Sequence, residues 1–141
     1  MAHPQLDAVA HLVPYLKLVE REKLRVVADQ VGCPTWSRMI AETTAQSLLQ
    51  VRQPDDARRL SGTYHLCSSG QTSWHGFAKA IIDLMPPETR KCREVEAITT
   101  ADYPTPTKRP AYSVMAAAKL ERAFGLRLPD WHESLKQVVE A

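Results

Sequence analysis

Two short segments of the chain carry side chains that could bind a polar ligand. The first, DQVGCPTW over residues 29–36, offers the amide of Gln30 and the hydroxyl of Thr35. The second, YPTPTKRP over residues 103–110, offers a tyrosine ring and Arg109, whose planar guanidinium can donate two hydrogen bonds to one phosphate. Its three prolines reduce the entropy lost when the segment is held against a ligand. Each segment could also be an ordinary turn with solvated side chains, because exposed Lys and Arg are common.

No local signature of a cofactor site or of a proton donor accompanies these segments. The five glycines, at positions 32, 62, 70, 76 and 125, form neither a GxGxxG nor a P-loop pattern, in which backbone N–H groups meet phosphate. No tyrosine is followed four residues later by a lysine, the spacing with which short-chain reductases activate a phenol as a proton donor. The sequence therefore predicts that this chain alone holds no catalytic residue and binds no cofactor.

The histidines and cysteines offer weaker candidates for chemistry. His65 and Cys67 could be two metal ligands, but a catalytic zinc usually has three protein ligands, which favours a half-buried strand pair instead. Cys33 has no neighbouring base and is predicted to fill space rather than to react. The three cysteines form neither a disulfide framework nor a CxxC metal pattern, and a reducing cytoplasm is the simplest compartment.

Length and composition fit one globular domain. The 141 residues are 44% apolar, which is enough for a hydrophobic core. The formal net charge is +2 with acids and bases mixed along the chain, which argues against a nucleic-acid binder. No apolar stretch approaches 18 residues and no leader-like N-terminus is present, so the sequence predicts neither a membrane span nor secretion.

Hydrophobic spacing and turn residues predict an alternation of helices and strands that would position the two segments. We expect a helix kinked by a proline, a buried strand, a helix with an apolar stripe, a polar loop, a second strand, a helix, a third strand and two final helices. These elements fall at residues 5–23, 24–29, 37–50, 51–62, 63–69, 73–85, 95–100, 113–124 and 130–141. Within them, Trp74 and Trp131 are expected in the core. Thr72 or Ser73 is expected to cap the helix over 73–85, Ser113 to cap the helix that it begins, and Gly125 to end that helix.

This order of elements predicts an α/β fold with a small, mostly parallel sheet and flanking helices. Three short strands make a small sheet, and strongly apolar strands need neighbours and covering helices on both faces. The predicted sheet is therefore expected to be part of a larger one.

Four segments, taken together and in order, resemble the dTDP-4-dehydrorhamnose reductase family, which are extended short-chain reductases of the sugar-nucleotide type. The family typically has DQ-x-G-x-P-T after a strand, G-x-Y-H-L followed by G-x-T-x-W, and Y-P-T-P-x-x-R-P-x-x-S-x-L. Any one of these motifs is weak, but their shared order and spacing make a strong signal. The matching segments here are LRVVADQVGCPT, GTYHLCSSGQTSWHGFA, YPTPTKRPAYSVM and KLERAFGLRLPDW.

The resemblance implies a Rossmann-type reductase of which this chain contains the C-terminal portion, with the N-terminal cofactor half missing. It assigns residues 20–141 to the sugar-nucleotide (substrate) binding portion and leaves 1–19 as an atypical N-terminal helical segment. The implied activity of the intact enzyme is NADPH-dependent reduction of dTDP-4-dehydro-L-rhamnose to dTDP-L-rhamnose, in deoxysugar and polysaccharide biosynthesis. The implied partners are a dTDP-deoxysugar and a separate Rossmann NADPH-binding half, without which the chain is expected to be inactive.

Carried over position by position, the resemblance makes Arg109 the first candidate for contact with the nucleotide or its diphosphate. Gln30, Thr35 and Tyr103 are secondary candidates for substrate contact. Some family members use a carboxylate for a metal-linked dimer where this chain has Arg38, which implies no metal here. Two other hypotheses stay open: a stand-alone sugar-nucleotide-binding or scaffold module, and a non-functional gene fragment.

Overall fold

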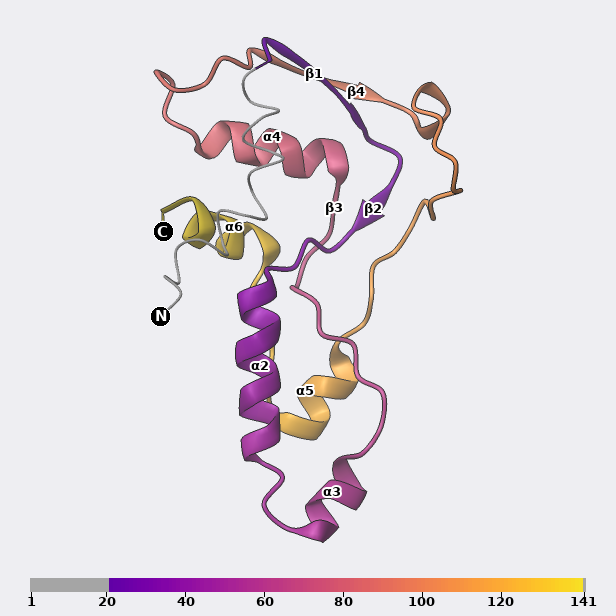
Figure 1. The fold of residues 1–141 in the computed structure, drawn as a ribbon, viewed down its shortest axis with the longest axis vertical. Helices are drawn as coiled ribbons and strands as arrows, with labels where there is room; N and C mark the ends of the chain where they lie inside the picture. Colours follow the sequence, from indigo (N-terminus) through magenta and orange to yellow (C-terminus); the bar gives the residue numbers. More distant parts are fainter. Residues whose placement is uncertain (1–20, 141) are drawn as a thin grey trace.

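The computed structural model describes residues 21–140 and shows an α/β arrangement (Figure 1). The helix predicted over 5–23 lies outside the described residues except at its end, where the chain bends at 21–22 before a strand begins. No helix in the described range is long and apolar enough to cross a bilayer. The elements are β1 (Lys23–Val27), β2 (Val31–Gly32), α2 (Ser37–Leu49), α3 (Pro54–Leu60), β3 (Thr72–Ser73), α4 (Trp74–Leu84), β4 (Glu94–Ile98), the 3-10 helix η1 (Thr100–Asp102), α5 (Ala118–Phe124) and α6 (Trp131–Glu140).

Strands β1 and β4 pair in parallel, as the α/β prediction requires, with Leu24 opposite Val95. Helix α4 covers one face of this pair (Figure 1), where Leu24, Ile82 and Cys92 form a buried cluster. The other face carries charged side chains because side chains in a strand alternate between the two faces. The ion pairs there are Lys23–Glu94 at 3.0 Å, Lys23–Glu96 at 2.9 Å and Arg25–Glu96 at 3.8 Å. The strand over 24–29 was predicted to be buried. This prediction was wrong for the outer face of β1, which is charged and exposed.

A second, antiparallel pair joins β2 to β3 and leads into α4. Helix α4 begins where the Ser73 hydroxyl accepts a hydrogen bond from the backbone N–H of Gly76 at 3.0 Å, the N-cap that the sequence predicted. Gly70, just before this pair, has φ +76°, and a Cβ there would clash with the Asp130 carboxylate. The chain can turn into β3 at this position because glycine tolerates a positive φ and has no Cβ to clash with the Asp130 carboxylate.

Helices α2, α3 and α5 extend away from the strands at the lower end of the molecule (Figure 1). Helix α2 buries no residue, so the predicted apolar stripe was wrong: Ile40 and Leu48 are exposed. The predicted polar loop over 51–62 contains helix α3, which begins with Pro54 and a reciprocal capping box between Gln53 and Asp56. Local capping therefore forms a helix where hydrophobic periodicity is absent.

The strand predicted over residues 63–69 does not form. This segment is extended, but it makes only one isolated bridge, between Ser69 and Asp130. The prediction that Ser113 caps a helix was also wrong, because α5 begins five residues later at Ala118. Its end was predicted correctly, since Gly125 adopts the left-handed conformation, with φ +66°.

The two predicted core tryptophans differ in the structure. Trp131 is half-buried at the start of α6 and packs edge-to-face on Phe77 of α4, with ring centroids 6.0 Å apart. Trp74 is 49% exposed, so its placement in the core was wrong.

Candidate functional site

The structure brings the first predicted ligand segment, 29–36, against residues 111–113, which directly follow the second. The backbone N–H of Val31 donates to the carbonyl of Ala111 at 2.8 Å, and the N–H of Ser113 donates to the carbonyl of Val31 at 2.8 Å. The Ser113 hydroxyl adds a bond to the same carbonyl at 3.2 Å. These contacts form a parallel bridge between Val31 and Tyr112, so β2 lies between β3 and residues 111–113.

Gly32 allows this close approach. A Cβ at Gly32 would lie 2.9 Å from the Ser113 hydroxyl oxygen, which is too close for an ordinary contact. The sequence motif places this glycine inside the segment 29–36. Its structural reason is the Ser113 side chain, whose hydroxyl occupies the space that a Cβ would need.

Gln30 lies at the carboxyl ends of both parallel strands. Its amide Nε2 donates to the Thr100 hydroxyl at 3.1 Å. The backbone N–H of Thr100 donates to the two Asp29 carboxylate oxygens at 2.9 and 3.0 Å, and its hydroxyl donates to one of them at 2.7 Å. These hydrogen bonds from Thr100 lower the pKa of the Asp29 carboxyl. One edge of the candidate site is thereby tied to the start of η1. Among residues 21–140, no hydrogen bond to the side-chain carbonyl oxygen of Gln30 is formed.

Thr35 closes the first segment against residues 63–69. Its hydroxyl donates to the carbonyl of Cys33 at 3.0 Å and accepts from the backbone N–H of Ser68 at 3.0 Å. The side chain of Thr35 is therefore used twice within the protein, which holds the P-T turn in one conformation.

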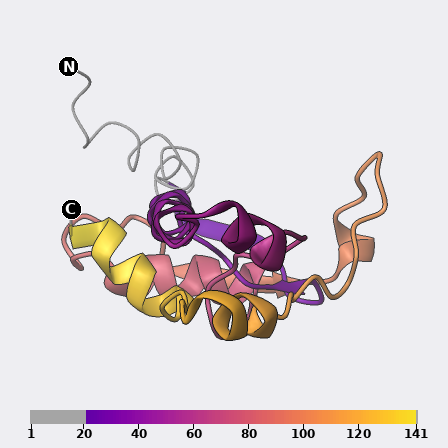
Figure 2. The same ribbon diagram turned by 90° about the horizontal axis from the view of Figure 1, so that it is seen from below.

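The orange segment that follows β4 projects from the body of the molecule (Figure 2), and the predicted residues Tyr103 and Arg109 belong to this stretch of the chain. Arg109 is exposed, and its guanidinium has no hydrogen-bond or ion-pair partner within residues 21–140. Tyr103 is 61% exposed and follows η1 directly. The structure thus gathers Gln30 and Thr35 near the strand ends, and it leaves Arg109 and Tyr103 on a solvent-exposed arm.

Two polar side chains that the motif search did not select lie beside these segments. The phenol of Tyr112 donates to the Gln71 side-chain carbonyl at 3.0 Å, which links the end of the second segment to the start of β3. Tyr112 is 63% exposed, so most of its ring remains open to solvent. Sequence position could have singled out these two residues. Tyr112 lies two residues after the last proline of the arm, and Gln71 directly follows Gly70.

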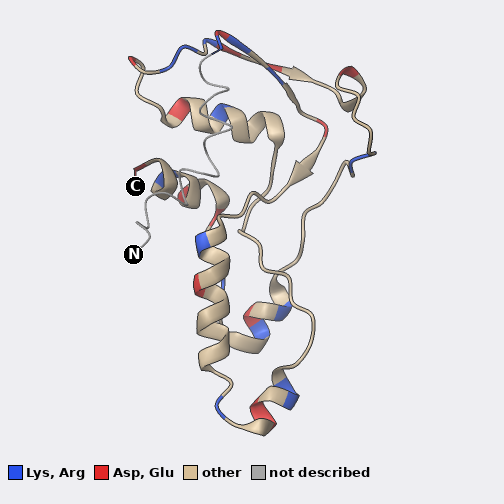
Figure 3. Cartoon of the chain, in the orientation of Figure 1, with Lys and Arg blue, Asp and Glu red and all other residues tan. Residues whose placement is uncertain are grey.

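Charge is mixed over the described surface, with blue and red residues interspersed on the strand pair and the helices (Figure 3). The arm formed by residues 103–110 is an exception, since its two charged residues are both cations. An exposed guanidinium on a proline-rich arm that also carries an exposed tyrosine ring can bind an anionic ligand that has a flat ring.

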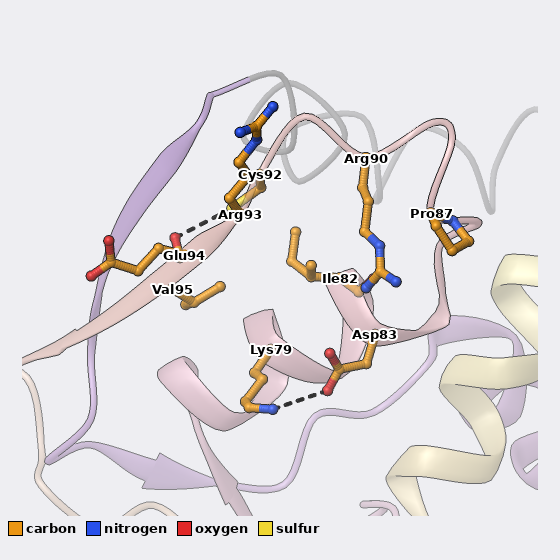
Figure 4. A pocket seen from close by; sticks show the side chains of 9 residues that line it. All are labelled: Lys79, Ile82, Asp83, Pro87, Arg90, Cys92, Arg93, Glu94 and Val95. Atoms are coloured by element: carbon orange, nitrogen blue, oxygen red, sulfur yellow. Dashed lines mark hydrogen bonds and ion pairs between the residues drawn. The ribbon is translucent and has the colours of Figure 1, made fainter.

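A separate cavity of about 540 Å³ lies between α4 and the start of β4 (Figure 4). Lys79 pairs with Asp83 there at 3.2 Å, and an Arg90 guanidinium nitrogen donates to the Ile82 carbonyl at 3.4 Å. None of the four predicted substrate-binding residues lines it. The cavity lies at the amino end of β4, whereas the candidate site lies at the carboxyl ends of β1 and β4.

The residues considered as metal ligands do not come together. His65 is exposed whereas Cys67 is buried, and Arg38 pairs with Glu42 at 2.7 Å on α2. Within residues 21–140, no group of three or more His, Cys, Asp or Glu side chains is arranged to hold a metal ion.

The parallel strand pair and its covering helix define a piece of an α/β protein, in which polar segments follow the carboxyl ends of both strands. Residues 8–141 match the family model described as RmlD substrate binding domain, and the chain belongs to this family. The resemblance seen in the sequence motifs is thereby confirmed, and the match extends upstream of the first motif.

Similar curated proteins and solved structures agree with this assignment. The chain is 44% identical over 117 residues to a dTDP-4-dehydrorhamnose reductase of Burkholderia thailandensis, covering 79% of this chain and 39% of that protein. It is 42% identical over 123 residues to one of Sinorhizobium fredii, covering 85% of this chain and 40% of that protein.

A crystal structure of a dTDP-4-dehydrorhamnose reductase from Clostridium acetobutylicum superposes with a TM-score of 0.74 at 31% identity, covering 94% of this chain and 42% of that chain. The crystal structure of a dTDP-4-dehydrorhamnose reductase from Bacillus anthracis, in complex with NADP, has a TM-score of 0.73 at 29% identity. The match covers 94% of this chain and 43% of that chain. The chain therefore spans about two-fifths of the length of the relatives it matches.

Proposed function

We propose that this chain is the substrate-binding portion of a dTDP-4-dehydrorhamnose reductase-like enzyme and that it binds a dTDP-deoxysugar. The observation that supports the proposal is the hydrogen-bonded junction between β2 and residues 111–113, which joins two of the family motifs side by side. Support for the substrate comes from the relatives, whose names describe dTDP-4-dehydrorhamnose reductases.

In this proposal Arg109 contacts the diphosphate of the sugar nucleotide. Its guanidinium is exposed and lacks an internal partner, so binding a phosphate does not require breaking an ion pair among the described residues. Tyr103 stacks on a flat part of the ligand, and the free carbonyl oxygen of Gln30 accepts from a sugar hydroxyl. Thr35 contributes by holding its turn, because its hydroxyl is already bonded to Cys33 and Ser68.

The described residues do not fit a dinucleotide. The Ser73 hydroxyl caps the N-terminus of α4, and α2 begins directly after Trp36, without the glycine-rich turn that lets a pyrophosphate reach free N–H groups. We therefore assign NADPH, which supplies hydride to the 4-keto carbon, to a Rossmann half outside this chain, as part of the same protein or as a partner. An enzyme that uses NADPH and has free cysteines fits the predicted cytoplasmic location.

Isothermal titration calorimetry of the 141-residue chain with dTDP-rhamnose and, separately, with NADPH tests the proposal. We expect the sugar nucleotide to bind and NADPH not to bind. Tight binding of NADPH would contradict the assignment of the cofactor to another half. Absence of any binding, together with non-cooperative unfolding in urea, would instead support a non-functional fragment.

A second assay separates an enzyme portion from a stand-alone binding module. The chain is mixed with a Burkholderia thailandensis relative truncated before its matching region, and NADPH oxidation is followed with dTDP-4-dehydrorhamnose present. Recovery of turnover supports a substrate half that works with a cofactor half. Sugar-nucleotide binding without any recovered turnover supports the module.

A further inference from the structure

A hydrogen bond between two exposed side chains crosses β2 beside the candidate site. The phenol of Tyr112 donates to the side-chain carbonyl oxygen of Gln71 at 3.0 Å. Val31 of β2 pairs with Tyr112 on one side and with Ser73 of β3 on the other. Because directly paired residues of neighbouring strands point to the same face, Tyr112 and Ser73 share one face of this small sheet. Gln71 lies two residues before Ser73, which brings it to the same face, where the phenol reaches it.

This hydrogen bond fixes the direction in which the Gln71 amide points. The carbonyl oxygen is held by the phenol, so the NH2 group points away from Tyr112, and within residues 21–140 that group has no hydrogen-bond partner. Gln71 is exposed, and the Tyr112 ring beside it is 63% exposed. The surface therefore presents N–H donors of fixed direction next to an open aromatic ring. Such a pair suits a flat ligand group with a carbonyl oxygen at its edge.

We infer that Gln71 binds the base of the nucleotide and that Tyr112 is the positioning residue that orients its amide. The inference rests on the proposed function, in which Arg109 contacts the diphosphate. Arg109 lies three residues before Tyr112, so their Cα atoms are at most about 11 Å apart. One nucleotide can therefore have its diphosphate at Arg109 and its base at Gln71. There the Gln71 amide donates to the 4-carbonyl oxygen of a thymine or uracil ring.

The orientation of the amide determines which bases fit. Thymine and uracil have a hydrogen-bond acceptor at the 4-position, which complements the NH2 group of Gln71. Cytosine has an amino group there, so two donors face each other and neither is satisfied. Turning the amide over would make the phenol oxygen of Tyr112 the acceptor in place of the amide carbonyl, and the phenol oxygen is the weaker acceptor. The chain should therefore prefer thymine and uracil nucleotides to cytosine nucleotides.

Calorimetric titration of the 141-residue chain with dTDP and, separately, with dCDP tests the inference. We expect dTDP to bind about tenfold more tightly, the scale of one hydrogen bond exchanged for one unsatisfied donor. Tyr112→Phe keeps the ring but frees the amide, so the preference should fall below about twofold, mainly because dCDP binds more tightly. Gln71→Glu should reverse the preference, because a carboxylate can accept from both the phenol and the cytosine amino group.

Two controls separate recognition of the base from other losses. Arg109→Ala should weaken binding of dTDP and dCDP by the same factor, because both nucleotides carry the same diphosphate. Tyr64→Phe is matched to Tyr112→Phe, since the Tyr64 phenol also donates to an oxygen, the Leu60 carbonyl at 2.8 Å, but lies outside the candidate site. Tyr64→Phe should keep the preference of the wild type. A merely structural role of Tyr112 would weaken both nucleotides equally and leave the ratio of their affinities unchanged.

The ratio of the two affinities also supplies the results that would overturn the inference. Equal affinities of the wild type for dTDP and dCDP would do so, as would a preference that persists in Tyr112→Phe or is not reversed in Gln71→Glu. If dTDP-rhamnose still binds in such a case, the proposed function stands and only the inference fails. If neither dTDP nor dTDP-rhamnose binds to the wild type, the proposed function fails and the inference fails with it.

Discussion

The strand pair with its covering helix and the arm over residues 103–110 are built on different principles. Between β1, β4 and α4, apolar side chains are buried and the backbone is paired along the whole of both strands. The arm buries nothing, and three prolines and a local bond from the Thr105 hydroxyl to the Thr107 carbonyl at 2.7 Å stiffen it. The comparison indicates that stability resides in the first region, whereas the second contributes little to it and, in the proposed function, contacts the ligand.

The most disruptive change should be in the buried cluster. Leu24→Ala removes a side chain that is 6% exposed and packed on Ile82 and Cys92, and we expect it to lower the free energy of unfolding by about 2–5 kcal/mol. Urea denaturation measures the loss. Leu49→Ala is the control, because Leu49 is 71% exposed and its truncation should change stability by less than about 0.5 kcal/mol. Equal effects of the two changes would contradict the location of the core.

The arm should show the opposite behaviour. Arg109→Ala is expected to weaken binding of dTDP-rhamnose by about 1.5–3 kcal/mol, the scale of a hydrogen bond to a charged group, and to leave the urea midpoint unchanged. Calorimetric titration measures the affinity. Arg58→Ala on α3 is the matched control, because this arginine is also exposed and lies outside the candidate site. Unchanged affinity in Arg109→Ala would remove this residue from the site.

The junction between the two regions can be tested at Gly32. Gly32→Ala places a methyl group against the Ser113 hydroxyl, so we expect a loss of about 1 kcal/mol in stability from the displaced hydrogen bond to Val31. In the Ser113→Ala background the same change should cost much less, because the clash is gone. Identical costs in both backgrounds, measured by urea denaturation, would show that the two segments do not meet there.

The smallest effect should be a pH dependence at the strand ends. The pKa of Asp29 is lowered by its hydrogen bonds from Thr100, so its contribution to stability is present above the unfolded pKa of about 3.9 and is lost as pH falls through the folded pKa. The difference in urea midpoint between the wild type and Asp29→Asn should therefore shrink as the pH is lowered from about 5 to about 3. A difference that is constant over this range would contradict the Asp29–Thr100 contact.

The sequence predicted the elements that bury apolar side chains or begin at clear punctuation. Strands β1 and β4 and helix α4 lie close to their expected positions, and Ser73 and Gly125 have the predicted capping roles. Helix α3 was missed because it depends on a proline and a capping box and not on apolar spacing. The strand over 63–69 was predicted from its local pattern of side chains, but within residues 21–140 its one bridge is to Asp130, far along the chain.

The candidate site was predicted as two separate segments. Sequence patterns single out Gln30, Thr35, Tyr103 and Arg109, but they contain no information on the bridge that joins β2 to residues 111–113. The hydrogen bond from Tyr112 to Gln71 could not be predicted from the sequence either, because it depends on where β3 lies. Long-range backbone pairing therefore determines how the two segments are arranged.

The most direct test of the account is a titration of the isotopically labelled chain with dTDP-rhamnose, followed by amide NMR shifts. We predict that the largest shifts fall in residues 29–36, 71–73 and 103–113, with little change along α4 and β4. Shifts concentrated instead around Lys79, Arg90 and Arg93, which line the α4–β4 cavity, would contradict the assignment of the site to the two segments.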